Sequence, residues 1–246
     1  VDSPYWQEIN YTLTQFRGLV EGYNYRVSKD GSPKDAMTYL DFWFLEAECE
    51  LYDVESAIDR KPKKVSGPTN GEDCTGLIRL LPDFSDIYFA QDTWSDFRDL
   101  HGELKEYHFP IPEFKAKRVL FSTRVGKLFS YDDFYIADSG LLVLETTMSI
   151  FNMSLYDLVV PENLLTWLRA VRSMWLTDRA TEFTKHNSGT LNNQYLILDT
   201  KKFRRKKKPS SDLLWMIEQY PGDYERKDLT DFHAKNGYFP SINLLF

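Results

Sequence analysis

The stretch that organises the chain is Gly67-Pro-Thr-Asn-Gly-Glu-Asp73 followed by Cys74-Thr-Gly-Leu-Ile-Arg-Leu-Leu81. The first part contains glycine and proline and predicts a linker. The second part is mostly apolar and predicts a buried strand. A short turn, Pro82–Ser85, and a second strand-like run, Asp86–Trp94, follow at once. The sequence therefore predicts a β-hairpin that begins at Cys74, directly after a loop that a cleavage reaction can reach.

A cysteine at this position has a chemical meaning if the Asp73–Cys74 bond is broken. Cys74 then carries a thiol and an α-amine on the same residue. The amine has a reference pKa of about 7.7–8.0 and the thiol one of about 8.5, so the amine can accept the thiol proton near neutral pH. Gly76 places a small residue close to the thiol and predicts room for a substrate. The residues leave open the alternative of an inert buried cysteine at the start of a core strand.

Composition indicates a folded globular protein. The chain has 246 residues, of which 42% are hydrophobic and 15% aromatic, and a formal charge of −7. That charge gives no overall attraction to nucleic acid or to an anionic membrane. No apolar run approaches the roughly 18–20 residues of a membrane span. The two cysteines, Cys49 and Cys74, can form one disulfide or none, and neither they nor the histidines have metal-ligand spacing, so we expect no metal and no cofactor.

The periodicity of apolar residues predicts a mixture of helices and short strands. Helices are predicted over Pro4–Gly22, Ser95–Glu106, Pro161–Leu176 and Asp212–Gln219, and further strands over Arg118–Thr123, Lys127–Tyr131, Phe134–Asp138, Leu141–Thr147 and Gln194–Asp199. Residues 35–59 give no clear pattern, and the tail from Asn236 is predicted to be irregular. Because strands and helices do not alternate regularly, the pattern favours a layered α+β fold with antiparallel sheets.

Three polar features have two interpretations each. Lys201–Lys208 holds seven basic residues in eight positions and is either a solvated surface loop or a contact for anionic lipid or nucleic acid. The segment Asn187–Asn193 is either a corner that satisfies buried backbone groups or part of a pocket wall. The triplets that begin at Asn10 and Asn152 are acceptor sequences for N-glycosylation, and they also arise by chance.

The runs Cys74–Pro82 and Asp86–Trp94 resemble the phospholipase B-like family of lysosomal and secreted proteins, which belongs to the N-terminal nucleophile hydrolases. Further stretches resemble the family in the same order: Asp2–Trp6, Tyr131–Tyr135, Ser139–Thr147, Asn187–Gln194 and Gly237–Asn243. The resemblance covers nearly the whole chain and is weak over about Val20–Asp59 and Lys201–Ser211. Family members are longer, so the resemblance implies that this chain is the middle portion of a precursor.

The resemblance implies an αββα four-layer sandwich and a precursor that cuts itself between Asp73 and Cys74. Residues 1–60 are then the N-terminal segment of the precursor, 61–73 the linker and propeptide end, and 74–246 the N-terminal nucleophile hydrolase core, truncated on its C-terminal side. The Cys74 thiol is expected to attack the Asp73 carbonyl, and hydrolysis of the resulting thioester frees the amine. The thiolate then attacks the ester or amide acyl carbon of a phospholipid or N-acyl substrate, with the amine as general base.

Other expectations about the setting of the protein also come from the resemblance. The resemblance implies an autocatalytically processed glycoprotein of lipid degradation, lysosomal or secreted, with glycans on Asn10 and Asn152. Its expected partners are the lipid or N-acyl substrate, the rest of its own longer precursor, and anionic lipid through Lys201–Lys208. Neither nucleic acid nor a transmembrane segment is expected.

Matching of these stretches places Trp94, Thr147 and Asn243 around the nucleophile. The resemblance implies that Asn243 donates to the oxyanion, Thr147 hydrogen-bonds the amine or the substrate, and Trp94 walls the pocket. From the residues alone they are a core Trp, a strand-end Thr and a turn Asn.

The chain departs from the family at Gln91, where a histidine is common. Glutamine cannot titrate, so any proton relay at that position is lost. The alternative function is therefore a catalytically weak or inactive lysosomal or secreted glycoprotein that binds lipid or another ligand. A papain-like site would instead need His186 or His233 beside Cys74, and the motif of that family around its cysteine is absent.

Overall fold

The computed structural model describes residues 4–60, 73–95, 97–112, 114–130, 132–160 and 185–246. Helical elements lie at α1 (Pro4–Asp30), η1 (Pro33–Asp35), α2 (Tyr39–Glu46), α3 (Glu48–Asp59), η2 (Phe97–Leu100), η3 (Met153–Leu158), η6 (Thr200–Lys202) and α5 (Thr230–Asn236). Strands lie at β1 (Asp73–Leu80), β2 (Ile87–Trp94), β3 (Gly102–His108), β4 (Arg118–Arg124), β5 (Tyr135–Ala137), β6 (Leu141–Thr147), β7 (Asn193–Asp199), β8 (Leu214–Tyr220), β9 (Asp223–Asp228) and β10 (Tyr238–Ser241). The helix predicted over Pro161–Leu176 lies outside the described residues.

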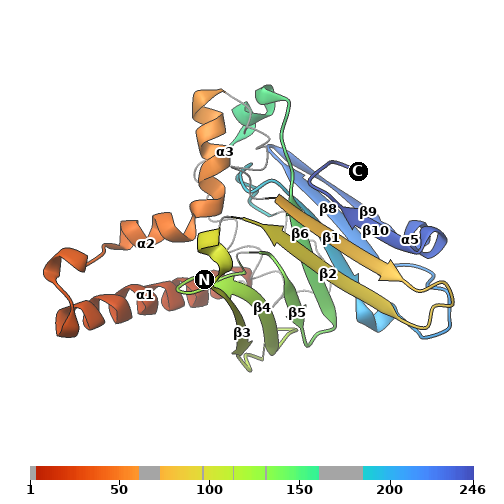
Figure 1. The fold of residues 1–246 in the computed structure, drawn as a ribbon, viewed down its shortest axis with the longest axis horizontal. Helices are drawn as coiled ribbons and strands as arrows, with labels where there is room; N and C mark the ends of the chain where they lie inside the picture. Colours follow the sequence, from red (N-terminus) through yellow and green to blue (C-terminus); the bar gives the residue numbers. More distant parts are fainter. Residues whose placement is uncertain (1–3, 61–72, 96, 113, 131, 161–184) are drawn as a thin grey trace.

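The strands form two antiparallel sheets that pack face to face. The small sheet has the order β10-β1-β2, and the large sheet has the order β3-β4-β5-β6-β7-β8-β9. Figure 1 shows β1 and β2 in front of β6, and apolar side chains from both sheets form the core between them. That core contains Ile78, Leu144, Leu196, Leu198, Leu214, Met216 and Phe239. The protein is therefore an α+β sandwich, as the sequence predicts.

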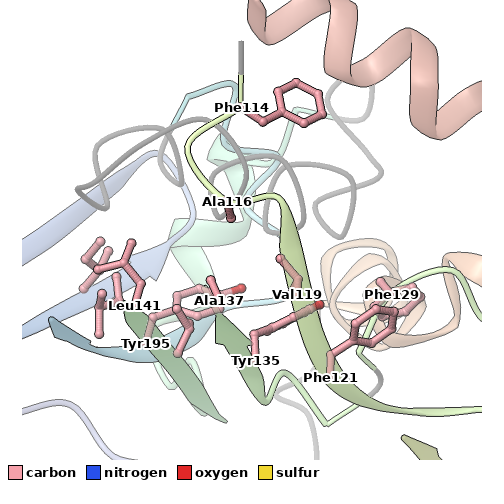
Figure 2. Packing of buried hydrophobic residues seen from close by; sticks show 12 residues of the cluster. Phe114, Ala116, Val119, Phe121, Phe129, Tyr135, Ala137, Leu141 and Tyr195 are labelled. Atoms are coloured by element: carbon pink, nitrogen blue, oxygen red, sulfur yellow. The ribbon is translucent and has the colours of Figure 1, made fainter. Parts of the chain in front are cut away.

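The opposite face of the large sheet carries a second, more aromatic core. Phe121, Tyr135 and Tyr195, from β4, β5 and β7, lie on this face and are almost fully buried (Figure 2). Phe114, from the loop before β4, extends this core towards α1, where the Tyr11 ring lies 6.1 Å from its own, centroid to centroid. The large sheet is thus buried on both faces, which explains why β6, β7 and β8 read as nearly continuous apolar runs.

The first helices extend away from the sheets. Figure 1 shows α1 and α2 as an arm on one side of the molecule and α3 turning back along the sheets. The α2 helix begins with a capping box, because Thr38 Oγ1 accepts from the Asp41 amide and the Asp41 carboxylate accepts from the Thr38 amide. This pattern is the signal in residues 35–59 that the periodicity analysis missed. Among the described helices, none is long and apolar enough to cross a membrane.

The predicted helix over Ser95–Glu106 is wrong. A short 3-10 turn, Phe97–Leu100, is followed by strand β3, which pairs along its whole length with β4. Gly102 starts the strand, and Lys105 and Tyr107 point inward with the two-residue period of a strand. Phe97, Leu100 and Leu104, the apolar stripe of the predicted helix, are all exposed. Pairing with β4 therefore overrides the local helical spacing.

Three more local predictions need correction. Asp212–Gln219 is not helical: it contains β8, a central strand whose buried faces produce an apolar run that periodicity cannot distinguish from a helix. Lys127–Ser130 forms no strand, because Leu128 turns towards α2 and its amide donates to the Glu46 carboxylate at 3.3 Å. The tail is not irregular after Asn236, since β10 forms there and pairs with β1.

The polar segment Asn187–Asn193 is a hydrogen-bonded corner in this fold. The Asn187 amide donates to the carbonyls of Tyr220 and Asp223, and the Asn192 amide donates to the Gly189 carbonyl. These bonds match the interpretation of Asn187–Asn193 as a corner that satisfies backbone groups.

The basic segment Lys201–Lys208 is exposed and rests on the β1–β2 turn. The Lys206 amide donates to the Phe84 carbonyl at 2.7 Å, and the Arg205 guanidinium lies 3.3 Å from the Asp86 carboxylate.

Candidate active site

Cys74 is the second residue of β1 and lies between the two other strands of the small sheet. It faces Thr93 on β2, and its amide donates to Asn243 Oδ1, just beyond β10, at 3.1 Å. In the sequence Thr93 is 19 positions from Cys74, and Asn243 is 169 positions from it. The side chain of Cys74 points into the sandwich and is 6% exposed. Both cysteines are present as thiols, so the predicted option of a disulfide with Cys49 is not used.

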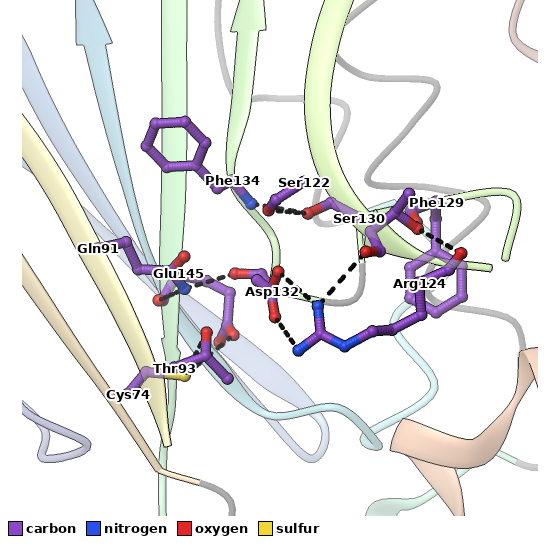
Figure 3. A network of polar contacts seen from close by, with 11 residues as sticks. Cys74, Gln91, Thr93, Ser122, Arg124, Phe129, Ser130, Asp132, Phe134 and Glu145 are labelled. Carbon is purple, nitrogen blue, oxygen red and sulfur yellow. Dashed lines mark hydrogen bonds and ion pairs between the residues drawn. The ribbon is translucent and has the colours of Figure 1, made fainter. Parts of the chain in front are cut away.

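The thiol contacts one hydroxyl and one carboxylate. Its sulfur lies 3.9 Å from Thr93 Oγ1 and 3.9 Å from Glu145 Oε1 on β6 (Figure 3). Burial, reinforced by the nearby Glu145 carboxylate, raises the pKa of the Cys74 thiol far above its usual range, although hydrogen bonds from Thr93 and the Thr147 backbone act in the opposite direction. In the continuous chain the thiol is therefore protonated at neutral pH.

Glu145 is the site residue that sequence reasoning missed. Its side chain is 4% exposed, and the carboxylate lies between the small sheet and the loop that carries Asp132. The signal that could have found it is a charged residue inside the otherwise apolar run Leu141–Thr147. A buried carboxylate needs a specific partner or role, because removal of its charge from water is costly.

Asn243 bridges the small sheet and β6 through its side-chain amide. Its Oδ1 accepts from the Cys74 amide, while its Nδ2 donates to the Thr147 carbonyl at 2.6 Å. Its backbone is left-handed, with φ 64°, a conformation that asparagine tolerates better than most residues. The oxygen of the amide therefore faces Cys74, and one of the two N–H groups expected to serve an oxyanion is used on Thr147.

A buried hydrogen-bond network holds the chain next to Asn243. Thr146 Oγ1 lies 2.6 Å from Ser241 Oγ and also accepts a hydrogen bond from the backbone N–H of Asn243 at 3.3 Å. Ser241 donates to Gln194 Oε1, and Gln194 Nε2 donates to Glu218 Oε1 at 2.6 Å. The network connects β6, β7, β8 and β10, so the position of Asn243 is fixed from several strands at once.

Gln91 connects the small sheet to β6 of the large sheet. Its Nε2 donates to the carbonyls of Asp132 and Glu145, the latter at 3.1 Å. Strand β5 reaches only as far as the Tyr135–Val143 pair, so on that side β6 has no strand partner at Glu145. The Gln91 amide satisfies a carbonyl that a longer β5 would otherwise satisfy.

The structure places the other predicted residues as follows. Trp94 ends β2 opposite Asp73 and is 57% exposed, so it is not a core tryptophan. Thr147 ends β6, and its backbone contacts both Asn243 and the Cys74 sulfur. The expected substrate space at Gly76 is filled by packing, because a Cβ there would lie 2.7 Å from Leu144 Cδ1.

An ion pair closes the side of the site away from the small sheet. The Arg124 guanidinium lies 3.0 Å from the Asp132 carboxylate, and Figure 3 shows Asp132 between Arg124 and Glu145. The histidines of the papain-like alternative lie elsewhere: His233 Nε2 is 3.1 Å from the Ile78 carbonyl, and His186 stacks near Trp6. Among the described residues no cluster of three or more His, Cys, Asp or Glu could hold a metal ion.

The candidate glycosylation residues are both on the surface. Asn10 is exposed in the middle of α1, whereas Asn152 is exposed at the start of η3. Asn152 Oδ1 accepts from Ser154 Oγ at 2.8 Å, so the first and third residues of that triplet are already in contact.

Fold and site together define an antiparallel α+β sandwich whose small sheet begins at a buried cysteine. The family model described as phospholipase B matches residues 1–246. The chain belongs to the phospholipase B family.

Similar proteins agree with this assignment. Phospholipase B-like protein B of Dictyostelium discoideum is 34% identical over 259 residues, which cover 99% of this chain and 45% of that protein. Phospholipase-B 81 of Drysdalia coronoides is 36% identical over 261 residues (100% and 47%), and human phospholipase B-like 1 is 34% identical over 251 residues (98% and 45%). The chain thus spans about half the length of the curated relatives it matches.

Proposed function

We propose that this chain carries the nucleophile of a phospholipase B-like hydrolase that cuts an ester or amide acyl bond. The observation that carries the proposal is the setting of Cys74, whose thiol is within 4 Å of a buried carboxylate and whose nitrogen is held by Asn243. Family membership supports a lipid or N-acyl substrate. The fold proposed for the whole protein is the αββα sandwich of the N-terminal nucleophile hydrolases, with 1–60, 61–73 and 74–246 as precursor segment, linker and core.

The proposed reaction begins after the Asp73–Cys74 bond has been cut. The amine of Cys74 takes the thiol proton, and the thiolate attacks the acyl carbon, so that a C–S bond forms and the carbonyl oxygen becomes an oxyanion. Asn243 Oδ1 is positioned to accept from the amine and orient it, while the second N–H of its amide is our choice of oxyanion donor. Collapse expels the alcohol or amine, which takes the proton, and water then hydrolyses the thioester.

Two other residues shape the site in this proposal. Thr147 acts through its backbone, which contacts both the sulfur and Asn243. Trp94, exposed beside Asp73, supplies an apolar wall at the entrance once the linker has left. Aromatic rings bind acyl chains through contact area, which suits a lipid substrate.

The setting of the protein is also proposed. Exposed Asn10 and Asn152 support a glycoprotein that is lysosomal or secreted. The arm of α1 and α2 exposes large apolar side chains, among them Tyr25 and Leu40, and we propose that the rest of the longer precursor covers them.

One observation favours a second candidate function. The side-chain Nε2 of Gln91 donates to both carbonyls that join the two sheets, and the side chain cannot titrate. A family member that kept the sandwich and lost turnover would look the same at this position, and it would bind lipid or another ligand without cutting it.

The test is the N-terminus of the mature protein and the effect of Cys74 substitutions. We expect a fragment that begins at Cys74, no such fragment in Cys74→Ala, and loss of acyl-bond hydrolysis by at least a hundredfold in that variant. Cys74→Ser keeps a weaker nucleophile and is expected to cleave slowly. Mature protein that never begins at Cys74, with turnover unchanged in Cys74→Ala, rejects the proposal. If the fragment forms but no ester or N-acyl substrate acylates Cys74, the binding-protein function is favoured.

A further inference from the structure

The amine that serves turnover does not exist before the chain is cut. In the continuous chain the Cys74 nitrogen belongs to a peptide bond and donates its hydrogen to Asn243 Oδ1 at 3.1 Å. The lone pair of an amide nitrogen is delocalised into the carbonyl, so it does not accept a proton at neutral pH. Cleavage of the Asp73–Cys74 bond therefore needs a different base from the one that serves the mature enzyme.

Among the residues that the structure describes, one group at the sulfur has the right chemistry. Of the side chains bonded to the Cys74 thiol, Thr93 provides a hydroxyl and Glu145 a carboxylate, each 3.9 Å from the sulfur. A hydroxyl is far too weak a base, whereas an ionised carboxylate is a competent one. The neighbouring Asp132 carboxylate lies 3.0 Å from the Arg124 guanidinium and is paired with it.

We propose that Glu145 is the base that takes the thiol proton during self-cleavage of the Asp73–Cys74 bond. The inference rests on the proposed function, because it assumes that Cys74 is the nucleophile of its own processing. It assigns a catalytic role to a residue that the turnover mechanism above leaves idle, and it separates the base for processing from the base for turnover.

The proton and the bonds balance as follows. Glu145 accepts the thiol proton, and the thiolate attacks the Asp73 carbonyl carbon to form a C–S bond and an oxyanion. The oxyanion reforms the carbonyl as the C–N bond breaks, and protonated Glu145 returns its proton to the leaving nitrogen of Cys74. The product is a thioester with a free amine. Water then cleaves the thioester to the Asp73 carboxylic acid, which ionises, and the Cys74 thiol.

Charge conservation favours this direct transfer. The thiol is buried beside Glu145, so a thiolate and an ionised carboxylate cannot coexist there at low cost. Transfer of the proton from sulfur to Glu145 keeps the charge of the pair at minus one throughout. Burial is the main cause of the raised pKa of the Cys74 thiol, and the repulsion by Glu145 that adds to it is relieved in the same step.

Gln91 is the positioning residue for this base. Its Nε2 donates to the Glu145 carbonyl at 3.1 Å and also to the Asp132 carbonyl, on the side of β6 that β5 leaves uncovered. The same side chain thereby fixes Glu145 relative to β2, two positions before Thr93, which contacts the thiol.

The test follows cleavage in the full-length precursor made by cell-free translation, with intact-mass analysis over time. Glu145→Gln keeps the size of the side chain and loses the basic oxygen, and we expect it to slow release of the Cys74 fragment by at least a hundredfold. Glu46→Gln is the matched control, because Glu46 is equally buried and contacts Leu128 instead of Cys74. This control is expected to cleave within threefold of the wild-type rate.

Rescue keeps the test decisive if Glu145→Gln folds poorly. Glu145→Ala is assayed in sodium formate and, as the reference, in sodium chloride of the same ionic strength. In formate it is expected to recover at least a tenth of the wild-type rate, because formate restores a carboxylate base. Glu145→Gln that cleaves at the wild-type rate while Cys74→Ala stays intact overturns this inference alone, as does Glu145→Ala that formate leaves inert. A wild-type precursor that stays intact overturns the proposed function as well.

Discussion

The role of Gln91 is decided by its two acceptors. A histidine at this position could titrate, but a neutral imidazole has one N–H and can satisfy only one of the two carbonyls that Gln91 reaches. Glutamine at position 91 therefore provides a second hydrogen bond between the sheets that a neutral histidine could not provide.

The first prediction concerns the Gln91 amide. Gln91→Glu replaces both N–H donors by acceptors that face the carbonyls of Asp132 and Glu145, and we expect it to destabilise the fold by about 1–3 kcal/mol. The measurement is chemical unfolding in a Cys74→Ala background, which prevents self-cleavage. Asn10→Asp, on the exposed side of α1, is the control that makes the same amide-to-carboxylate change and should change stability by less than about 0.5 kcal/mol. Equal stability of the two variants contradicts the bridging role.

The sequence allowed prediction of the site residues that have a local or family signature. Cys74 follows a linker and starts a strand, and Asn243 lies in a stretch that resembles the family. Glu145 is marked as unusual by its charge inside an apolar run, but nothing local shows that it meets Cys74, which lies 71 positions earlier in the chain. The orientation of the Asn243 amide likewise depends on contacts with Thr147 and Cys74.

At the scale of elements, the two strands that were predicted as helices share one cause. The stretch that contains β3 has apolar residues at helical spacing and β8 is an apolar run, yet pairing with β4 and with β7 and β9 decides their conformation. β10 is short, contains a proline and lies in an apolar tail without strand alternation, and pairing with β1 makes it a strand. Hairpins with short turns, such as β1–β2, are predictable because both partners lie in one stretch of sequence.

The second prediction concerns the contact between α2 and the turn before β5. Burial raises the pKa of Glu46 to about 7, although Lys127 and the Leu128 amide oppose the shift. Between pH of about 4.5 and 7 the folded state thus holds a proton that the unfolded chain has lost. Because the folded state binds more protons, stability falls as the pH rises through this window.

Glu46→Gln removes that proton equilibrium and keeps an oxygen for the Leu128 amide. We expect the variant to lose less stability than the wild type between pH 5 and pH 8, by about 1–3 kcal/mol in chemical unfolding of the Cys74→Ala precursor. Asp133, whose pKa burial raises to about 8, accounts for part of the slope that remains. Glu55→Gln, on the exposed side of α3, is the control. An unchanged slope in Glu46→Gln shows that Glu46 is not protonated in the fold.

At the scale of the whole molecule, the negative net charge repels an anionic membrane, whereas the basic segment Lys201–Lys208 attracts it. The chain carries a formal charge of −7, while Lys201–Lys208 concentrates seven cations on one exposed loop. Screening limits such charges to about 8–10 Å at physiological salt, so a membrane in contact with the loop would sense the loop and little of the remainder. Arg205 lies against Asp86, and the Lys206 amide is tied to Phe84, so the loop presents its charge from a fixed place.

The last prediction follows from that fixed place. We expect the precursor to bind phosphatidylserine-containing vesicles at 50 mM salt and to lose that binding at 500 mM, with no binding to neutral vesicles. Replacement of Lys206, Lys207 and Lys208 by Gln is expected to weaken binding by roughly a hundredfold, at about 1 kcal/mol per lysine. The control is the pair Lys29→Gln and Lys34→Gln, which removes exposed charge from the α1–α2 arm and should leave vesicle binding within threefold. Sedimentation with vesicles measures both. Vesicle binding that does not change with salt, or that is unchanged in the triple variant, contradicts the prediction. The cations of Lys201–Lys208 then serve only to keep the loop in solvent beside the β1–β2 turn.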